Sequence, residues 1–194
     1  MDSSKYGLKK IVVINIAFSC LTNIHIFVDI CKMKEIDCFT KGTVVCDLES
    51  TEKFSAIHEL ICCAPIFRDI ENAECLENAV IDREKIQSTG LGHGVAVAHG
   101  KSPIVGDIVL ALGISKKGIP FGAIDGEDVN YLFLVANPPD MQLKYLLALS
   151  VLVRSVRDEN FRDELLFCRN SKEVERRLNK AFNASMLKRG FPFS

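Results

Sequence analysis

Residues 83–101 read REKIQSTGLGHGVAVAHGK, and the prediction of the fold and of a reactive side chain begins from this stretch. Three glycines stand at alternate positions, Gly90, Gly92 and Gly94. Glycine allows backbone conformations and close approaches that other residues resist, so a tight turn is expected here. The apolar run of residues 95–98 then predicts a strand that delivers His99 to its end. Because Gly100 and Lys101 follow at once, backbone N–H groups and a cation flank an imidazole suited to accept a phosphoryl group.

The segments before this stretch predict one short strand and two helices. They are a strand near residues 44–48, a helix capped by Ser50 or Thr51 and ended by Pro65, and a short helix over residues 76–80. Phe54, Ile57 and Ile61 have the spacing of one apolar helix face. His58 falls on or beside that face, so we expect it to be structural.

The segments after the stretch predict further strands and three more helices. They are strands over 108–112, 119–123 and 129–136, a long helix over 141–157, and two smaller helices, the last capped by Ser171. Strands interleaved with helices on this scale predict an α/β domain, a three-layer α/β/α sandwich. The connection between His99 and Ile108 is too short for a helical crossover, so the central sheet is expected to be mixed.

Composition limits the classes of protein that this chain can belong to. A chain of 194 residues with a formal net charge of -1 suits one domain, with no bias toward nucleic acid or acidic membranes. The eight cysteines form no C-x-x-C pair, so reduced, mostly buried thiols and a cytoplasmic location are expected. Residues 11–31 are rich in apolar side chains, but Asn15, His25 and Asp29 interrupt them, which argues against a signal peptide or anchor.

Three other kinds of site fit the glycine-rich stretch less well. A dinucleotide-binding loop needs a strand before it and a helix after it, whereas a strand is expected after this glycine-rich stretch. A Walker loop needs glycine at the position of Val95. His93 and His99 could share a metal, but no Cys, Asp or Glu nearby completes a ligand set. A serine hydrolase would need a G-x-S-x-G turn, which the sequence lacks. We therefore expect no metal and no cofactor.

The order of motifs resembles the enzyme IIA domain of the fructose/mannitol class of the bacterial sugar phosphotransferase system, including its nitrogen-regulatory branch. In that family an Arg-Glu pair opens the motif, a Ser-Thr-Gly-x-Gly loop follows, and Gly-x-Ala-x-Pro-His-Gly ends it. The pair Arg83-Glu84 and residues 88–92 and 94–100 match in this order. The resemblance implies a domain over residues 34–183, with an N-terminal extension of unknown role, residues 1–33, and a tail, residues 184–194.

The resemblance also implies an activity. His99 would accept a phosphoryl group from a phosphohistidine of an HPr-type carrier protein and pass it to a IIB-type partner in sugar uptake. The alternative is a free-standing regulatory protein of the nitrogen type, whose phosphorylation state controls binding to target proteins. A third interpretation is a scaffold that kept the fold and lost transfer. No nucleic acid is implied, and the membrane is reached only through a transporter.

Site residues follow from the same resemblance. Arg83 is expected beside His99, since a guanidinium can engage two phosphoryl oxygens. The candidates for phosphoryl binding or support are Thr89, Gly90, Gly100, Lys101 and Gln142. The proline that usually precedes the active histidine is Ala98 here, and the family's second histidine is absent, with Gln142 the nearest equivalent. Glutamine can hydrogen-bond a phosphoryl oxygen but carries no positive charge. His93 is expected to be an exposed loop residue.

Overall fold

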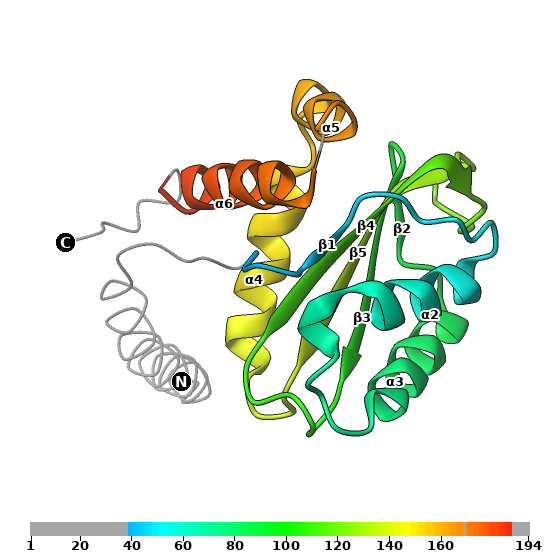
Figure 1. Ribbon diagram of the computed structural model, residues 1–194, viewed down its shortest axis with the longest axis vertical. Coiled ribbons are helices and arrows are strands. Elements are labelled where there is room, and N and C mark those ends of the chain that lie inside the picture. The colour runs from blue at the N-terminus through cyan, green and yellow to red at the C-terminus, as the bar shows by residue number, and fades with distance from the viewer. Residues whose placement is uncertain (1–38, 169, 188–194) are drawn as a thin grey trace, which may run out of the picture. The chain divides into compact units, whose positions relative to one another are not determined.

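A mixed sheet of five strands forms the centre of the fold in this computed structural model, which describes residues 39–168 and 170–187 (Figure 1). In spatial order the strands are β1 (Val44–Val45), β4 (Val109–Ile119), β5 (Val129–Asn137), β3 (Val95–Lys101) and β2 (Gly90–Gly92). β1 pairs with β4, and β3 with β5, in parallel; the other two pairs are antiparallel. The mixed sheet is thus confirmed. The short connection does reverse the chain between β3 and β4, but β5 is inserted between them.

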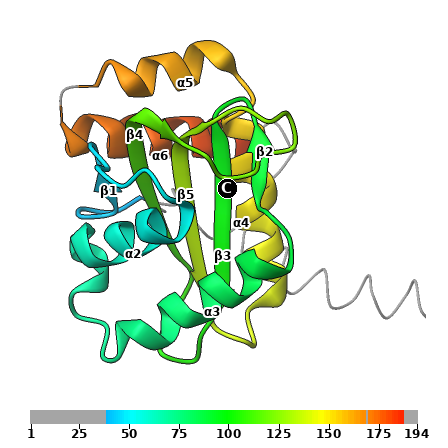
Figure 2. The ribbon, with the colours of Figure 1, turned by 90° about the vertical axis from the view of Figure 1, so that its right-hand side faces the viewer.

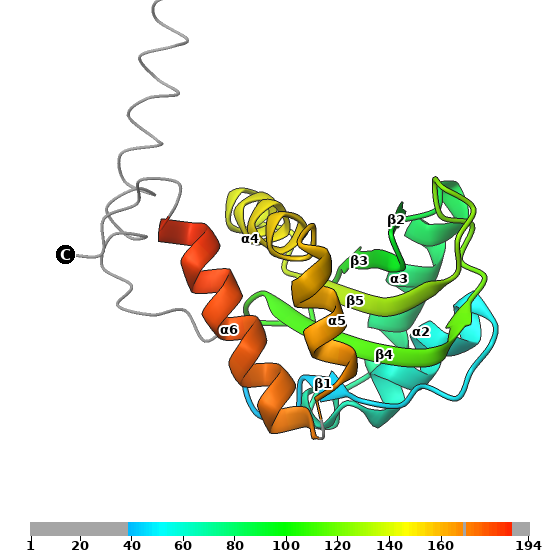
Figure 3. The same cartoon turned by 90° about the horizontal axis from the view of Figure 1, so that it is seen from above.

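Helices cover both faces of the sheet, which confirms the three-layer sandwich. On one face lie α2 (Lys53–Cys63) and α3 (Ala73–Ile86), joined by the 3-10 turn η1 (Pro65–Phe67). On the other lie α4 (Gln142–Ser155), α5 (Glu159–Leu166) and α6 (Ser171–Leu187). Figure 3 shows the two groups of helices on opposite sides, and Figure 2 looks onto α2 and α3 with β1 and β2 at opposite edges of the sheet. Apart from the last two residues of α6, these elements fall in one compact unit, Asp37–Ser185.

Small residues on β3 bring α3 close to the sheet. Ala96 and Ala98 are fully buried in the apolar core that includes Leu76 and Val80 of α3. At Gly100 a Cβ atom would lie 2.7 Å from Cγ2 and 2.9 Å from the backbone nitrogen of Val80, so any larger residue would collide with the helix. The close approach carries the last turn of α3 toward the end of β3, where His99 lies.

The buried face of α2 differs from the sequence prediction. The helix begins at Lys53 after Glu52, which gives no side-chain cap, instead of at Ser50 or Thr51. The N–H of Ser50 donates to the Glu59 carboxylate, which holds this turn outside the helix. The residues that α2 buries are Ala56, Ile57, Leu60 and Ile61. Phe54 is 39% exposed and His58 is exposed, so their predicted place at the packed face is wrong.

Several element lengths also differ from the prediction. α3 extends to Ile86, so Arg83 and Glu84 lie in its last turn rather than after it. β4 runs to Ile119, and no separate strand forms over residues 119–123, where Gly118 and Gly122 have positive φ. β2 was expected to be a loop, and α6, expected to be small, is 17 residues long.

The predicted burial of the cysteines is wrong for the described part of the chain. Cys46 and Cys168 are half-buried, and Cys62, Cys63 and Cys75 are exposed. All five are free thiols. The other cysteines, the extension over residues 1–33 and most of the predicted tail lie outside the described residues. Among the helices of residues 39–168 and 170–187, none has the length and hydropathy that crossing a membrane requires.

Candidate functional site

His99 lies near the end of β3, where the edge of this strand is open. β2 pairs with β3 only at Ala96 and Val95, and the carbonyl of Thr89 accepts the N–H of Val97. Beyond Val97, no described strand pairs with this side of β3. The imidazole of His99 is half-buried and contacts the ring of Tyr145 on α4, with centroids 5.8 Å apart and planes tilted by 41°. His99 therefore faces α4 at a reachable edge of the sheet.

One hydrogen bond decides which ring nitrogen of His99 can react. Nδ1 lies 3.0 Å from the carbonyl oxygen of Val97, and because a carbonyl can only accept, Nδ1 carries the proton. In the neutral ring Nε2 then keeps its lone pair. Burial lowers the pKa of His99 below 6.5; the bond to Val97 opposes this shift, and the positive charge of Arg83 adds to it. At neutral pH, Nε2 of His99 is therefore an uncharged nitrogen with a free lone pair.

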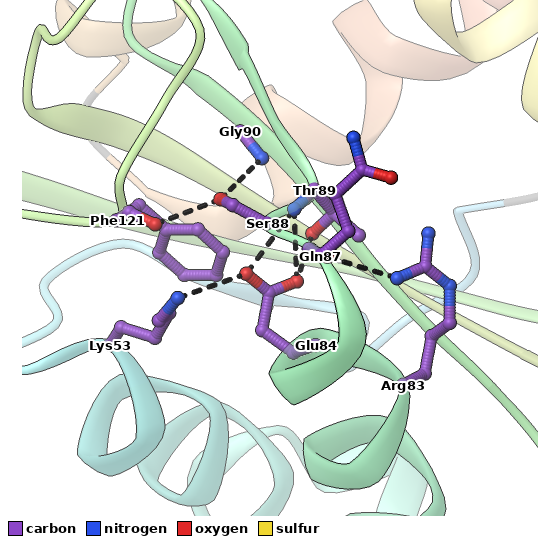
Figure 4. Close-up of polar contacts among 8 residues, drawn as sticks. All are labelled: Lys53, Arg83, Glu84, Gln87, Ser88, Thr89, Gly90 and Phe121. Carbon is purple, nitrogen blue, oxygen red and sulfur yellow. Dashed lines mark hydrogen bonds and ion pairs between the residues drawn. The ribbon is translucent and has the colours of Figure 1, made fainter.

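Arg83 supplies the positive charge at the site. It is half-buried in the last turn of α3, and its Nη1 donates to the carbonyl of Gln87 over 2.9 Å (Figure 4). No other hydrogen bond or ion pair joins it to the described residues, so the remaining N–H groups can bind an anion. Its charge lowers the pKa of both His99 and Tyr145, although burial raises the pKa of Tyr145 overall. The charge of the guanidinium thus acts on both rings.

Glu84, next to Arg83, points into the protein and holds the following loop (Figure 4). It is 2% exposed. Its carboxylate accepts the N–H of Thr89 at 3.0 Å and the hydroxyl of Thr89 at 2.6 Å, and pairs with Lys53 at 3.3 Å. Ser88 holds the same loop at a second point, because its hydroxyl donates to the carbonyl of Phe121 over 2.9 Å. These bonds fix the backbone beside the open edge of β3.

Three successive hydrogen bonds connect the carboxylate of Glu84 to the imidazole of His99. Glu84 accepts the N–H of Thr89, the carbonyl of Thr89 accepts the N–H of Val97 over 3.1 Å, and the carbonyl of Val97 accepts Nδ1–H of His99. The buried carboxylate therefore fixes the strand that orients His99.

The structure places the other predicted site residues in different surroundings. The hydroxyl proton of Thr89 is already donated to Glu84, and Gly90 packs against Ala123, where a Cβ would lie 2.6 Å from Cα. Lys101 is exposed at the end of β3. Gln142 is the first residue of α4, and its Oε1 is buried without a hydrogen-bond partner.

His93 is exposed in a left-handed conformation, with φ of 55°, which confirms the expected loop position. Its N–H donates to Asp125 over 2.7 Å. Neither His93 nor His99 belongs to a group of three metal-ligating side chains within the described ranges.

Sequence reasoning missed two contributors to the site. Glu84 was recognised only as half of a motif, and its role as a buried acceptor depends on Thr89 and Lys53, which come from separate elements. Tyr145 carried one usable signal, because it follows Gln142 by three residues, which places the two on one helix face.

Comparisons with known proteins identify the family of this chain. The family model described as phosphoenolpyruvate-dependent sugar phosphotransferase system, EIIA 2, matches residues 37–181. The fructose-specific EIIABC component of Bacillus subtilis is 31% identical over 134 residues, which are 69% of this chain and 21% of that protein. This chain thus spans about a fifth of the length of that relative.

Two solved structures share the fold. The nitrogen regulatory protein IIA-Ntr from Neisseria meningitidis has a TM-score of 0.64 and 27% identity, over 71% of this chain and 93% of that one. The mannitol enzyme IIA of Escherichia coli, solved in complex with its phosphorylated enzyme IIB, has a TM-score of 0.58 and 19% identity, over 72% and 95%. The match over residues 37–181 covers most of the chain and the whole site, and the chain belongs to the EIIA 2 family of the phosphoenolpyruvate-dependent sugar phosphotransferase system.

Proposed function

We propose that this protein is a phosphoryl carrier in which Nε2 of His99 accepts a phosphoryl group from a phosphohistidine of an HPr-type protein. The single observation that carries the proposal is the bond from Nδ1 of His99 to the carbonyl of Val97, which leaves Nε2 as the nucleophile. In the transfer the N–P bond of the donor breaks as the bond from phosphorus to Nε2 forms. The donor imidazole, protonated on its other nitrogen, leaves with the electron pair as a neutral ring, and the ring of His99 keeps its proton on Nδ1, so no oxidant is needed.

Arg83 has the charge that this reaction requires. Phosphoryl transfer depends mainly on positioning and on neutralising the negative charge spread over the phosphoryl oxygens. The guanidinium lies close enough to affect the pKa of His99, and most of its N–H groups make no bond to the described residues. Gln142, Lys101 and the backbone N–H of Gly100 are secondary candidates, whereas Thr89 and Gly90 support the site through the loop that Glu84 holds.

The acceptor in this proposal is a IIB-type domain in sugar uptake. The relative from Bacillus subtilis is named as an EIIABC component, and the similar mannitol enzyme was solved with its IIB partner, which supports an acceptor of that class. The exchange takes place in the cytoplasm, and the membrane is involved only through a transporter. A net charge of -1 gives no reason to include nucleic acid among the partners.

A regulatory protein of the nitrogen type is the second candidate. It is favoured by the match to the nitrogen regulatory protein of Neisseria meningitidis, 93% of which is covered. In that case the phosphoryl group on His99 would change which target proteins bind, because it adds negative charge beside Arg83.

Phosphorylation in a reconstituted system tests the proposal. Incubation with phosphoenolpyruvate, enzyme I and an HPr-type protein should add one acid-labile phosphate, and His99→Ala should abolish it. His93→Ala is the matched control and should be phosphorylated normally, because His93 is exposed and its hydrogen bond within the described part of the chain is made by its backbone N–H. Phosphate that still appears on His99→Ala would remove His99 as the acceptor. Transfer to a IIB domain, compared with capture of target proteins by each phosphorylation state, separates sugar uptake from regulation.

A further inference from the structure

Tyr145 is a buried residue whose hydroxyl has no role in holding the fold. The residue is 6% exposed, yet its hydroxyl makes no hydrogen bond to any described residue. Tyr131, which is buried to a similar degree, donates its hydroxyl to the carbonyl of Arg162. Buried tyrosines usually have such a partner. The hydroxyl of Tyr145 is not among the described polar atoms that are shut off from water without a partner, so it reaches water in the free protein. It is therefore available to bind a ligand group that comes to His99.

The surroundings of Tyr145 identify the chemistry of that group. Its ring lies against the imidazole of His99, with centroids 5.8 Å apart, and the charge of Arg83 acts on both side chains. One helical turn earlier on α4, Oε1 of Gln142 is buried without a partner. The imidazole thus has the phenol of Tyr145 beside it, and the positive charge of Arg83 acts on it from α3. An anion attached to the imidazole would satisfy the guanidinium and the hydroxyl together.

We propose that the hydroxyl of Tyr145 donates a hydrogen bond to an oxygen of the phosphoryl group on Nε2 of His99. This role rests on the proposed function, and it names Tyr145 as a second phosphoryl-contacting side chain besides Arg83. A phenol is a neutral donor, and burial raises the pKa of Tyr145 above 10, so it stays protonated throughout the physiological range. The charged and titratable groups that act on the imidazole and the phenol are Arg83 and Glu84 from α3. The contact with Tyr145 therefore does not switch off near neutral pH.

Tyr145→Phe tests this role, because it keeps the ring against His99 and removes only the hydroxyl. Tyr131→Phe is the matched control, since it removes a hydroxyl from the fold. A hydrogen bond to a charged acceptor is strong enough to change an equilibrium by about tenfold. The phosphorylation equilibrium between this protein and its HPr-type donor should thus shift about tenfold toward the donor in Tyr145→Phe. Tyr131→Phe should lower the midpoint of thermal unfolding and leave this equilibrium unchanged.

A second arm makes the test independent of the protein donor. Phosphoramidate, a small phosphoryl donor, should phosphorylate His99, and the ³¹P resonance of the phosphohistidine should differ between wild type and Tyr145→Phe but not between wild type and Tyr131→Phe. If phosphoramidate labels His99 and the protein donor does not, the proposed function fails while the resonance still decides on Tyr145. An equilibrium and a resonance that are both unchanged in Tyr145→Phe would overturn the inference, as would a wild-type His99 that neither donor phosphorylates.

Discussion

Replacing Glu84 by alanine should destabilise this protein more than any exposed substitution on the same helix. The carboxylate accepts the N–H of Thr89 at 3.0 Å and its hydroxyl at 2.6 Å, and both donors are buried. Without it, each donor loses its partner at a cost of about 1–3 kcal/mol. Lys53 contributes less, because 24% of its side chain is exposed and it can turn toward water. We expect the free energy of unfolding to fall by about 3 kcal/mol.

Urea denaturation measures this loss directly. With a slope of about 2 kcal/mol per molar urea, a loss of about 3 kcal/mol lowers the midpoint by roughly 1.5 M. Asp82→Ala is the control on the same helix, because the Asp82 side chain is 74% exposed and pairs only with the exposed Lys85. That surface pair should be worth less than about 0.5 kcal/mol. A midpoint for Glu84→Ala as close to wild type as that of Asp82→Ala would refute the reasoning.

A double-mutant cycle separates the two bonds that Glu84 accepts from Thr89. Thr89→Val removes the hydroxyl but keeps the backbone N–H, so alone it should cost about half as much as Glu84→Ala. In the Glu84→Ala background the same change should cost little, because the hydroxyl has already lost its acceptor. Equal costs of Thr89→Val in both backgrounds would show that the bond at 2.6 Å contributes nothing.

Three further changes test the site and its support. Arg83→Lys keeps the positive charge but loses the planar guanidinium that can bind two phosphoryl oxygens, so phosphoryl acceptance should slow about tenfold. The free energy of unfolding should change by less than about 0.5 kcal/mol. An unchanged rate would mean that the charge alone is sufficient. Because burial lowers the pKa of His99 below 6.5, acceptance measured against pH should decline toward acid with a midpoint below pH 6.5. The unfolded chain binds the proton more readily, so stability should fall from pH 6.5 toward the lowered pKa and then level off, and His99→Gln should lose this component. Gly100→Ala places a Cβ 2.9 Å from the backbone nitrogen of Val80, so the free energy of unfolding, measured with urea, should fall by about 1–3 kcal/mol. The rate of phosphoryl acceptance should fall as well, because α3 carries Arg83. A wild-type urea midpoint would show that α3 can move away from the new methyl group without cost.

The sequence predicted those parts of the fold that depend on local patterns. The apolar run of β5 and the stop at Pro65 were confirmed, because strand burial and the missing N–H of proline act within a few residues. The face of α2 was wrong because Phe54 and Ala56 compete for the core, and Ala56 lies against it. The length of β4 depends on its pairing with β5, a contact that local spacing does not reveal.

The candidate site divides in the same way. His99 and Arg83 could be found from a motif, since they lie in one stretch of sequence. For Tyr145 the sequence offered only its spacing from Gln142, because its contact with His99 exists only once α4 has packed over the end of β3. Long-range packing decides where each side chain points, and this packing cannot be read from the periodicity or spacing of residues.

The paired positions Arg83 and Glu84 link the stability of this protein to its chemistry. Successive residues of a helix point about 100° apart, so at the end of α3 Glu84 turns inward while Arg83 stays at the surface (Figure 4). Through Thr89 and Val97, Glu84 fixes the carbonyl that keeps the proton on Nδ1 of His99. The same helical turn therefore holds the tautomer of the proposed nucleophile and carries the positive charge that acts on it. A substitution that loosens Glu84 should slow phosphorylation even in molecules that remain folded, because Nε2 is then no longer held as the free nitrogen.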